Sequence, residues 1–85
     1  LDLRERVLAD RERVLGADHP DTLRTRMDLA ASYRGAGRMQ EAVDLCEQVL
    51  ADYERVLGTD HPDTLAARHN LARFRHAAAD VQQPQ

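Results

Sequence analysis

A nine-residue segment that occurs twice constrains the fold of this chain more than any other feature. Residues 15–23 read Leu-Gly-Ala-Asp-His-Pro-Asp-Thr-Leu, and residues 57–65 repeat them with Thr59 in place of Ala17. Equivalent residues are therefore 42 positions apart, from 15 to 57. A period of about 20 to 50 residues is typical of stacked repeat proteins, in which each repeat is one supersecondary unit. We therefore expect the 85 residues to contain copies of a single structural unit.

This segment, in either copy, has the composition of a helix end followed by a helix start, and we call it the hinge segment. In the first copy, Gly16 suits the left-handed position just beyond a helix, where a side chain would clash. Pro20 suits the first helical position, and it biases the preceding His19 out of the helical conformation. Asp18 or His19 can cap the new helix. We therefore expect each hinge segment to join two helices.

Apolar residues recur at helical spacing on both sides of the two hinge segments. The glycines of Gly35-Ala36-Gly37 interrupt this pattern between the hinges, as expected of a turn. The sequence therefore predicts an all-α fold. Its four helices are expected over residues 1–15, 20–35, 39–57 and 62–79, followed by a frayed tail at 80–85.

Composition argues against several functional classes. Charged residues make up 32% of the chain and hydrophobic residues 42%, which is ordinary for a soluble helical protein. The net charge of −3 argues against a nucleic-acid partner. No apolar run approaches the roughly 18 residues that a membrane span needs. Cys46 is alone, so no internal disulfide forms, and a free thiol fits a reducing compartment. We therefore expect a cytoplasmic protein without nucleic-acid or membrane partners.

The repetition is strong at first and then fades. The first 30 residues share 21 identities with residues 43–72, whereas residues 31–43 share 2 with the last 13. The turn glycines Gly35 and Gly37 have alanine as their counterparts. Leu1 aligns with a position inside the third expected helix, so we expect the chain to begin within a repeat and to be a fragment.

The residues after the first hinge segment follow a known family pattern. Leu29-Ala30 and Tyr33 match its first helix, Gly37 its turn, and Ala42 its close helix contact. Its second helix is matched by Leu45, Cys46, Val49 and Leu50. The chain resembles a tetratricopeptide repeat of the 42-residue kind, as in kinesin light chains and many bacterial regulators. The resemblance covers residues 1–76 and is made specific by the doubled hinge.

The resemblance implies a right-handed superhelix of helix pairs, in which the first helix of each pair lines a concave groove. It also implies a non-catalytic module that binds a protein or peptide segment and holds no cofactor. The family's groove positions fall here on Arg24, Met27, Asp28, Ala31, Arg34, Ala66, His69, Asn70, Arg73 and His76. Asn70 matches the family asparagine that bonds a bound peptide's backbone. Its counterpart Asp28 can accept a hydrogen bond but cannot donate one.

Charge differs between the expected groove helices and the helix outside them. Helices 20–35 and 62–79 carry a net positive charge, whereas helix 39–57 is strongly acidic. One interpretation is a groove that attracts acidic segments and holds their carboxylates with Arg side chains. The other is an ordinary solvated surface. The sequence leaves both open.

The histidine and cysteine positions favour neither a metal site nor an active site. His19 and His61 lie one repeat apart. His69 and His76 are about 10 Å apart along one helix, too far to share a zinc ion. Cys46 lies on an apolar helical stripe, as expected of an inert core thiol. The sequence therefore predicts no metal, no cofactor and no enzymatic activity.

The two end helices lack a partner helix within the chain, which suggests a second role. Helix 1–15 is an outer helix without its groove partner, and helix 62–79 is a groove helix without its outer partner. About three repeats are usually needed to bury such faces. The apolar residues expected to be exposed are Leu3, Val7 and Leu8 at one end and Leu71, Phe74 and Ala78 at the other. The alternative function is thus self-association, as a closed dimer or an end-to-end superhelix.

Overall fold

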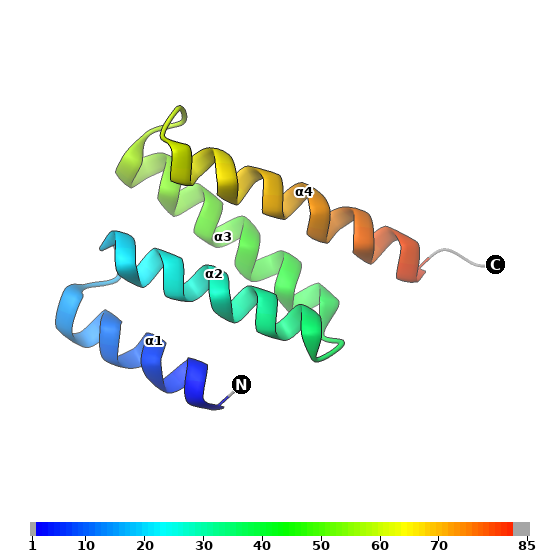
Figure 1. Cartoon of the computed structure of the whole chain (residues 1–85), viewed down its shortest axis with the longest axis horizontal. Helices are drawn as coiled ribbons and strands as arrows, with labels where there is room; N and C mark the ends of the chain where they lie inside the picture. Colours follow the sequence, from blue (N-terminus) through cyan, green and yellow to red (C-terminus); the bar gives the residue numbers. More distant parts are fainter. Residues whose placement is uncertain (1, 83–85) are drawn as a thin grey trace.

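The computed structural model of the chain describes the backbone of residues 2–82 and the side chains of residues 3–79. Four helices run through these residues: α1 (Asp2–Leu15), α2 (Pro20–Gly35), α3 (Met39–Leu57) and α4 (Pro62–Gln82) (Figure 1). Residues 2–82 contain no strand, and the predicted all-α repeat fold is confirmed. Helix α4 continues to Gln82, beyond its expected end at 79, and the rest of the expected tail lies outside the described residues.

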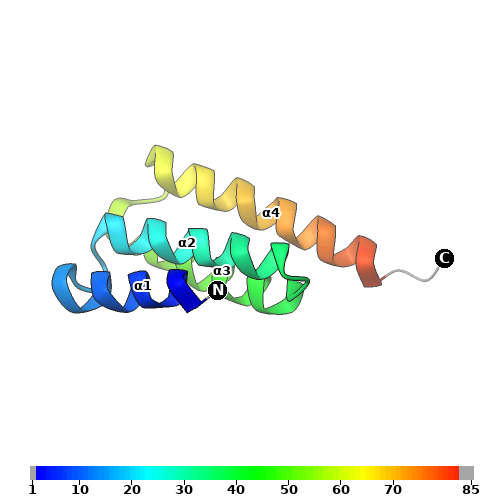
Figure 2. The same ribbon diagram turned by 60° about the horizontal axis from the view of Figure 1, so that its bottom comes forward.

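Successive helices pack on one another and build two layers. Helix α1 contacts α2, α2 contacts α3, and α3 contacts α4. Figures 1 and 2 together show α1 and α3 in one layer and α2 and α4 in the other. The result is a flat array of 46 × 32 × 14 Å. None of the helices within residues 2–82 is long and apolar enough to cross a bilayer.

The two hinge segments have the same geometry, as their sequences predict. In each, a fully buried threonine hydroxyl donates back to a carbonyl of the preceding helix. Thr22 bonds the carbonyl of Arg11 at 3.4 Å, and Thr64 bonds that of Tyr53 at 3.3 Å. These bonds hold the end of one helix against the start of the next in both copies.

Histidine caps the helix that follows each hinge. The Nδ1 atoms of His19 and His61 accept hydrogen bonds from the backbone N–H groups of Asp21 and Asp63, at 3.1 and 3.0 Å. This bond satisfies one of the N–H groups that a helix start leaves without an intrahelical partner. The imidazole, rather than the aspartate before it, is therefore the cap.

Glycine ends the preceding helix, but not in the left-handed helical conformation that the sequence analysis expected. Gly58 has φ 93° and ψ 159°, and Gly16 has φ 94°. Positive φ with extended ψ is open essentially only to glycine. The Gly58 N–H still donates to the carbonyl of Glu54, so the helix closes normally before the chain turns away.

The core lies mainly along α3, which sits between α2 and α4. One cluster of buried residues joins Ala30, Ala42, Val43, Cys46, Leu71 and Phe74. A second joins Leu23, Val49, Tyr53 and Ala67. All three helices contribute to both clusters, and α3 supplies half of the buried cluster residues, more than either neighbour.

The apolar stripe of α4 is not exposed, and this part of the sequence analysis was wrong. Leu71 and Phe74 are each 5% exposed and belong to the first core cluster, and Ala78 is half-buried against the same cluster. The stripe faces α3, the outer helix that precedes α4, rather than the absent helix that would follow. Among the large apolar side chains described on α4, the exposed one is Leu65, at 49%.

On α1 the expectation of exposure is met more closely. Leu3 is 73% exposed and Val7 is 38% exposed, whereas Leu8 is half-buried. The outer face of α1 therefore does carry uncovered apolar side chains.

Candidate peptide-binding groove

The predicted groove residues line two neighbouring hollows between α2 and α4. The first hollow, of about 240 Å³, is lined by Arg24, Met27, Asp28, Tyr53, Asp63, Ala66, Ala67 and Asn70. The second, of about 420 Å³, is lined by Arg34, His69, Ala72, Arg73, His76 and Ala77. Nine of the ten predicted groove positions thus line one of these hollows, and Ala31 lines neither. We call the two hollows together the α2–α4 groove.

The first hollow has side chains of both signs. Arg24 lies 3.7 Å from Asp21 in an exposed ion pair, and Asp28 and Asp63 also line the hollow. Asn70 adds an amide that can both donate and accept. This end of the groove can therefore pair with a peptide backbone but does not favour one sign of charge.

The floor of the first hollow comes from α3 and was missed by the sequence analysis. Tyr53 is 5% exposed, and burial raises the pKa of its phenol, so the side chain is neutral. The sequence analysis placed Tyr53 on an outer helix, where the family pattern predicts no groove residue. The repeat pattern assigns the groove to first helices alone, yet Tyr53 reaches between them.

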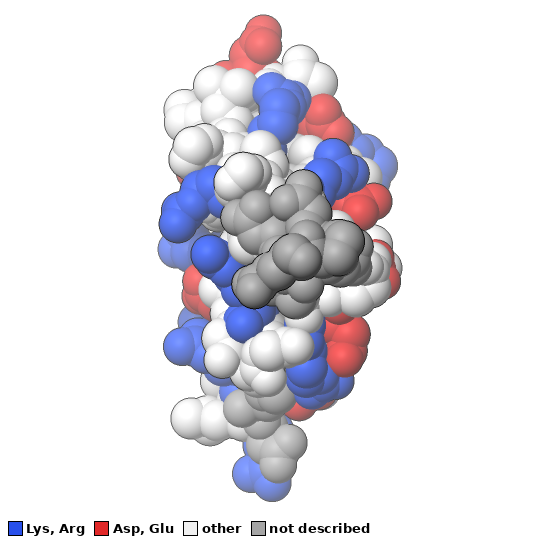
Figure 3. Space-filling model, turned by 90° about the vertical axis from the view of Figure 1, so that its right-hand side faces the viewer, with Lys and Arg blue, Asp and Glu red and all other residues white. Residues whose placement is uncertain are grey.

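The second hollow is basic. Its charged or titratable lining residues are Arg34, Arg73, His69 and His76, and none of the carboxylates among the described side chains of residues 3–79 lines it. The guanidinium of Arg34 lies 5.3 Å from the ring centroid of Phe74, a cation–π distance that holds the side chain at the groove edge. Figure 3 shows Arg side chains gathered along one side of the molecule, while acidic and basic side chains alternate along the other. The predicted positive charge of the groove is thus concentrated at one end.

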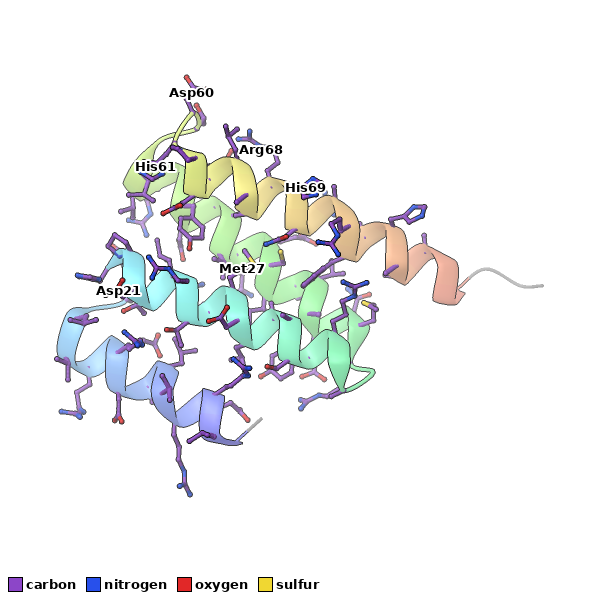
Figure 4. All side chains as sticks on the ribbon, viewed as in Figure 1. Asp21, Met27, Asp60, His61, Arg68 and His69 are labelled. Atoms are coloured by element: carbon purple, nitrogen blue, oxygen red, sulfur yellow. The ribbon has the colours of Figure 1, made fainter. Side chains whose placement is uncertain are left out.

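Met27 joins the groove to the core. It points from α2 toward α3 and α4 (Figure 4), and its Sδ accepts a weak hydrogen bond from the Cys46 thiol at 3.7 Å. Cys46 is fully buried, and burial raises its pKa to about 11. A thiol that stays protonated is a poor nucleophile, so Cys46 acts here as a packing residue.

Within the described part of the chain, no three His, Cys, Asp or Glu side chains gather as a metal site would require. The arrangement offers a hydrogen-bonding amide, an aromatic floor and a basic end. Among the described residues that line the groove, no nucleophile and base are in contact.

Stacked helical hairpins with a groove along one layer define the class of α-solenoid repeat proteins. The sequence profile of the tetratricopeptide repeat family matches residues 1–21 and 22–63. The chain therefore belongs to the tetratricopeptide repeat family. Repeats of this family generally mediate protein–protein interactions and are generally not enzymes.

Solved structures support the same assignment. The chain matches the crystal structure of nearly identical TPR-like repeats assigned to a kinesin light chain of Podosopora anserina, with a TM-score of 0.84 and 41% identity. The match covers 95% of this chain and 38% of the Podosopora anserina chain, so this chain spans about two-fifths of that protein. A point variant of the same protein matches equally well. No curated protein matches the chain.

Proposed function

We propose that the chain is a non-catalytic module that binds a protein segment of acidic character in the α2–α4 groove. The observation that carries this proposal is the second hollow, which is lined by Arg34, Arg73 and two histidines and by no carboxylate of the described residues. Arg73 forms no ion pair with any described residue, so its guanidinium is available for a ligand carboxylate. Arg presents several N–H donors in a plane that fits a carboxylate with two parallel bonds.

The neighbouring first hollow would hold the backbone of the same segment. Asn70 can donate to a peptide carbonyl and accept from a peptide N–H, whereas Asp28 can only accept. The apolar floor of Met27 and Tyr53 gives an adjoining side chain a place to pack. The segment would thus lie along the groove with its acidic part at the Arg34 end.

Titration calorimetry with two peptides tests this function. One peptide is rich in Asp and Glu, and the other has Asn and Gln at the same positions. We expect the acidic peptide to bind more tightly, and Arg73→Gln to weaken its binding about tenfold, which is the loss of one charge-assisted hydrogen bond. Arg34→Gln should have a similar effect, and added salt should weaken binding further.

Arg6→Gln is the matched control, because Arg6 lies exposed on α1, away from both hollows. Thermal unfolding of each variant shows whether the fold survives the change, which matters for Arg34 because it also contacts Phe74. Equal affinity for the two peptides, or an equal loss in Arg6→Gln, would show that the basic hollow does not select the ligand.

A further inference from the structure

The packing around α2 and α3 shows how the uncovered faces of α1 and α4 can be filled. Leu23 on α2 is fully buried and packs with Val49, Tyr53 and Ala67. Its counterpart one period later is Leu65 on α4, which is 49% exposed. The same side chain at the same place in the repeat is therefore covered in one copy and open in the other.

The residues that surround Leu23 have counterparts one period earlier in the sequence, at the opposite end of the molecule. They are Val7, Arg11 and Thr25, and all three line a hollow of about 350 Å³ between α1 and α2. The Nε of Arg11 is buried there without a hydrogen-bond partner among the described residues. We call this hollow the α1 socket. The α1 socket is thus the counterpart, one repeat earlier, of the site that Leu23 fills.

A four-residue ion-pair network seals the α2–α3 contact. Arg26 lies 2.5 Å from Asp52, and its side chain is only 12% exposed. Arg55 bonds the other oxygen of Asp52 at 3.2 Å and reaches Asp18 in the hinge at 2.7 and 3.1 Å. The network joins α2 and the first hinge segment to α3.

The counterparts of these four residues are divided between the two open ends. Arg68 and Asp60 lie on α4 and the second hinge segment, and project on the same side of the molecule in Figure 4. Asp10 and Arg13 lie on α1 and already pair with each other at 3.4 Å, as Asp52 and Arg55 do. Asp60 has no ion-pair partner among residues 3–79. The two ends thus carry residues of opposite charge at matching places in the repeat.

We propose that a second copy of the chain docks head to tail, with its α1 packed on α4 of the first copy. Leu65 fills the α1 socket of the second copy, and Arg68 and Asp60 complete the network with the second copy's Asp10 and Arg13. Arg68 exchanges its exposed pair with Glu54, at 3.1 Å, for the new one. An exposed pair contributes little, so the exchange costs little.

This contact has a definite geometry. It joins two different surfaces and repeats the relation between successive repeats, so it does not close on itself and continues the superhelix. The contact needs no peptide ligand, and peptide binding in the second hollow needs no second copy, so the assembly stands or fails separately from the proposed function.

Sedimentation over a range of concentrations tests this assembly. We expect the average mass of the intact chain to rise with concentration beyond that of two 9.6 kDa chains. Leu65→Asp should weaken the association at least about tenfold, because it removes the apolar contact that Leu65 would make with Leu3 and Val7 and takes a carboxylate out of water. Val7→Asp should do the same from the other end. Val14→Asp is the matched control, since Val14 is 67% exposed and lines neither surface.

Mixing the two defective variants gives the sharpest result. The intact α1 of Leu65→Asp can dock on the intact α4 of Val7→Asp, so an equal mixture should form particles of two chains and no larger ones. Circular dichroism checks that each variant keeps its helices. Asp10→Arg replaces Val7→Asp if the latter unfolds, because the Asp10 side chain is 72% exposed.

Three outcomes would overturn the proposal. They are an intact chain that stays a monomer at all concentrations, an association that saturates at two chains, and an association that Leu65→Asp leaves unchanged. Failure of the mixture to form two-chain particles from folded variants would also contradict it.

Discussion

The histidines at the hinge perform a task more often given to Ser, Thr, Asp or Asn. The imidazole Nδ1 of His61 accepts from the N–H of Asp63, and the proline between them begins the helix without needing a donor of its own. Gly58, three residues before His61, turns the chain through a backbone conformation that residues with a side chain disfavour. Gly58, with its positive φ, and Pro62, whose ring fixes a negative φ, thus reverse the chain within one short segment.

Substituting alanine for glycine at two positions should have opposite effects on stability. At Gly58, with φ 93°, Gly58→Ala should lower the free energy of unfolding by about 1–2 kcal/mol, since only the backbone opposes the new Cβ. At Gly35, which ends α2 without positive φ, Gly35→Ala should be neutral or stabilise by up to about 1 kcal/mol. Urea unfolding of both variants measures the difference. A Gly58→Ala chain as stable as the parent would show that the turn tolerates a side chain.

At the scale of elements, α3 is tied to its neighbours by charge as well as by apolar packing. Arg26 on α2 and Arg55 on α3 both bond Asp52, and Arg55 continues to Asp18. Burial opposes ionisation of Asp52, but the two arginines outweigh it and hold the pKa of Asp52 below its ordinary value of 3.8. The hydrogen bond from Arg55 likewise lowers the pKa of Asp18.

These lowered pKa values predict a loss of stability in acid. A carboxyl with a lower pKa in the folded state binds fewer protons there than in the unfolded state. Its stabilisation is therefore complete above the ordinary pKa of 3.8 and is lost as the pH falls through the folded value. We expect the free energy of unfolding to fall as the pH is lowered from about 5 to about 3.

Asp52→Asn isolates this effect. It should lower the free energy of unfolding at neutral pH by about 1–2 kcal/mol and reduce its dependence on acid, because Arg26 loses its charged partner. Asp44→Asn is the control, since Asp44 lies exposed on the same helix and forms no ion pair among the described residues. Equal acid sensitivity in the Asp52→Asn variant and the parent would show that other carboxyls dominate.

At the scale of the whole molecule, the position of a residue in the array decides its contribution to stability more than its identity does. Leu23 and Leu65 occupy the same place in consecutive repeats, but only Leu23 has a helix on both sides. Ala30 is likewise fully buried, whereas its counterpart Ala72 is exposed. Residues at equivalent places in successive repeats therefore contribute differently to stability.

The two leucines provide a matched test of this statement. Leu23→Ala should lower the free energy of unfolding by about 3 kcal/mol, because it leaves a cavity in a closed cluster. Leu65→Ala should cost less than about 1 kcal/mol when measured at a concentration low enough to prevent association. Equal losses would mean that Leu65 is covered within a single chain.

Several features of the fold could be read from residues alone, because they depend on local backbone chemistry. Glycine, proline and the capping residue set the helix ends at the hinge, and the spacing of apolar residues set the helices between them. Nine of the ten predicted groove residues also line the α2–α4 groove, since a repeat of fixed period places equivalent positions on one face. Whether they bind a peptide stays a prediction.

Other features depended on which helix lies opposite, and no local pattern contains that information. Leu71 and Phe74 have the spacing of an apolar stripe whether it is covered or open, and only the position of α3 shows that it is covered. Tyr53 enters the groove because α3 passes beneath the space between α2 and α4. Arg26 and Asp52 are 26 residues apart and meet only once α2 and α3 have packed. Burial and ion pairing are properties of pairs of elements, so they follow from the packing of the helices rather than from the preferences of any one of them.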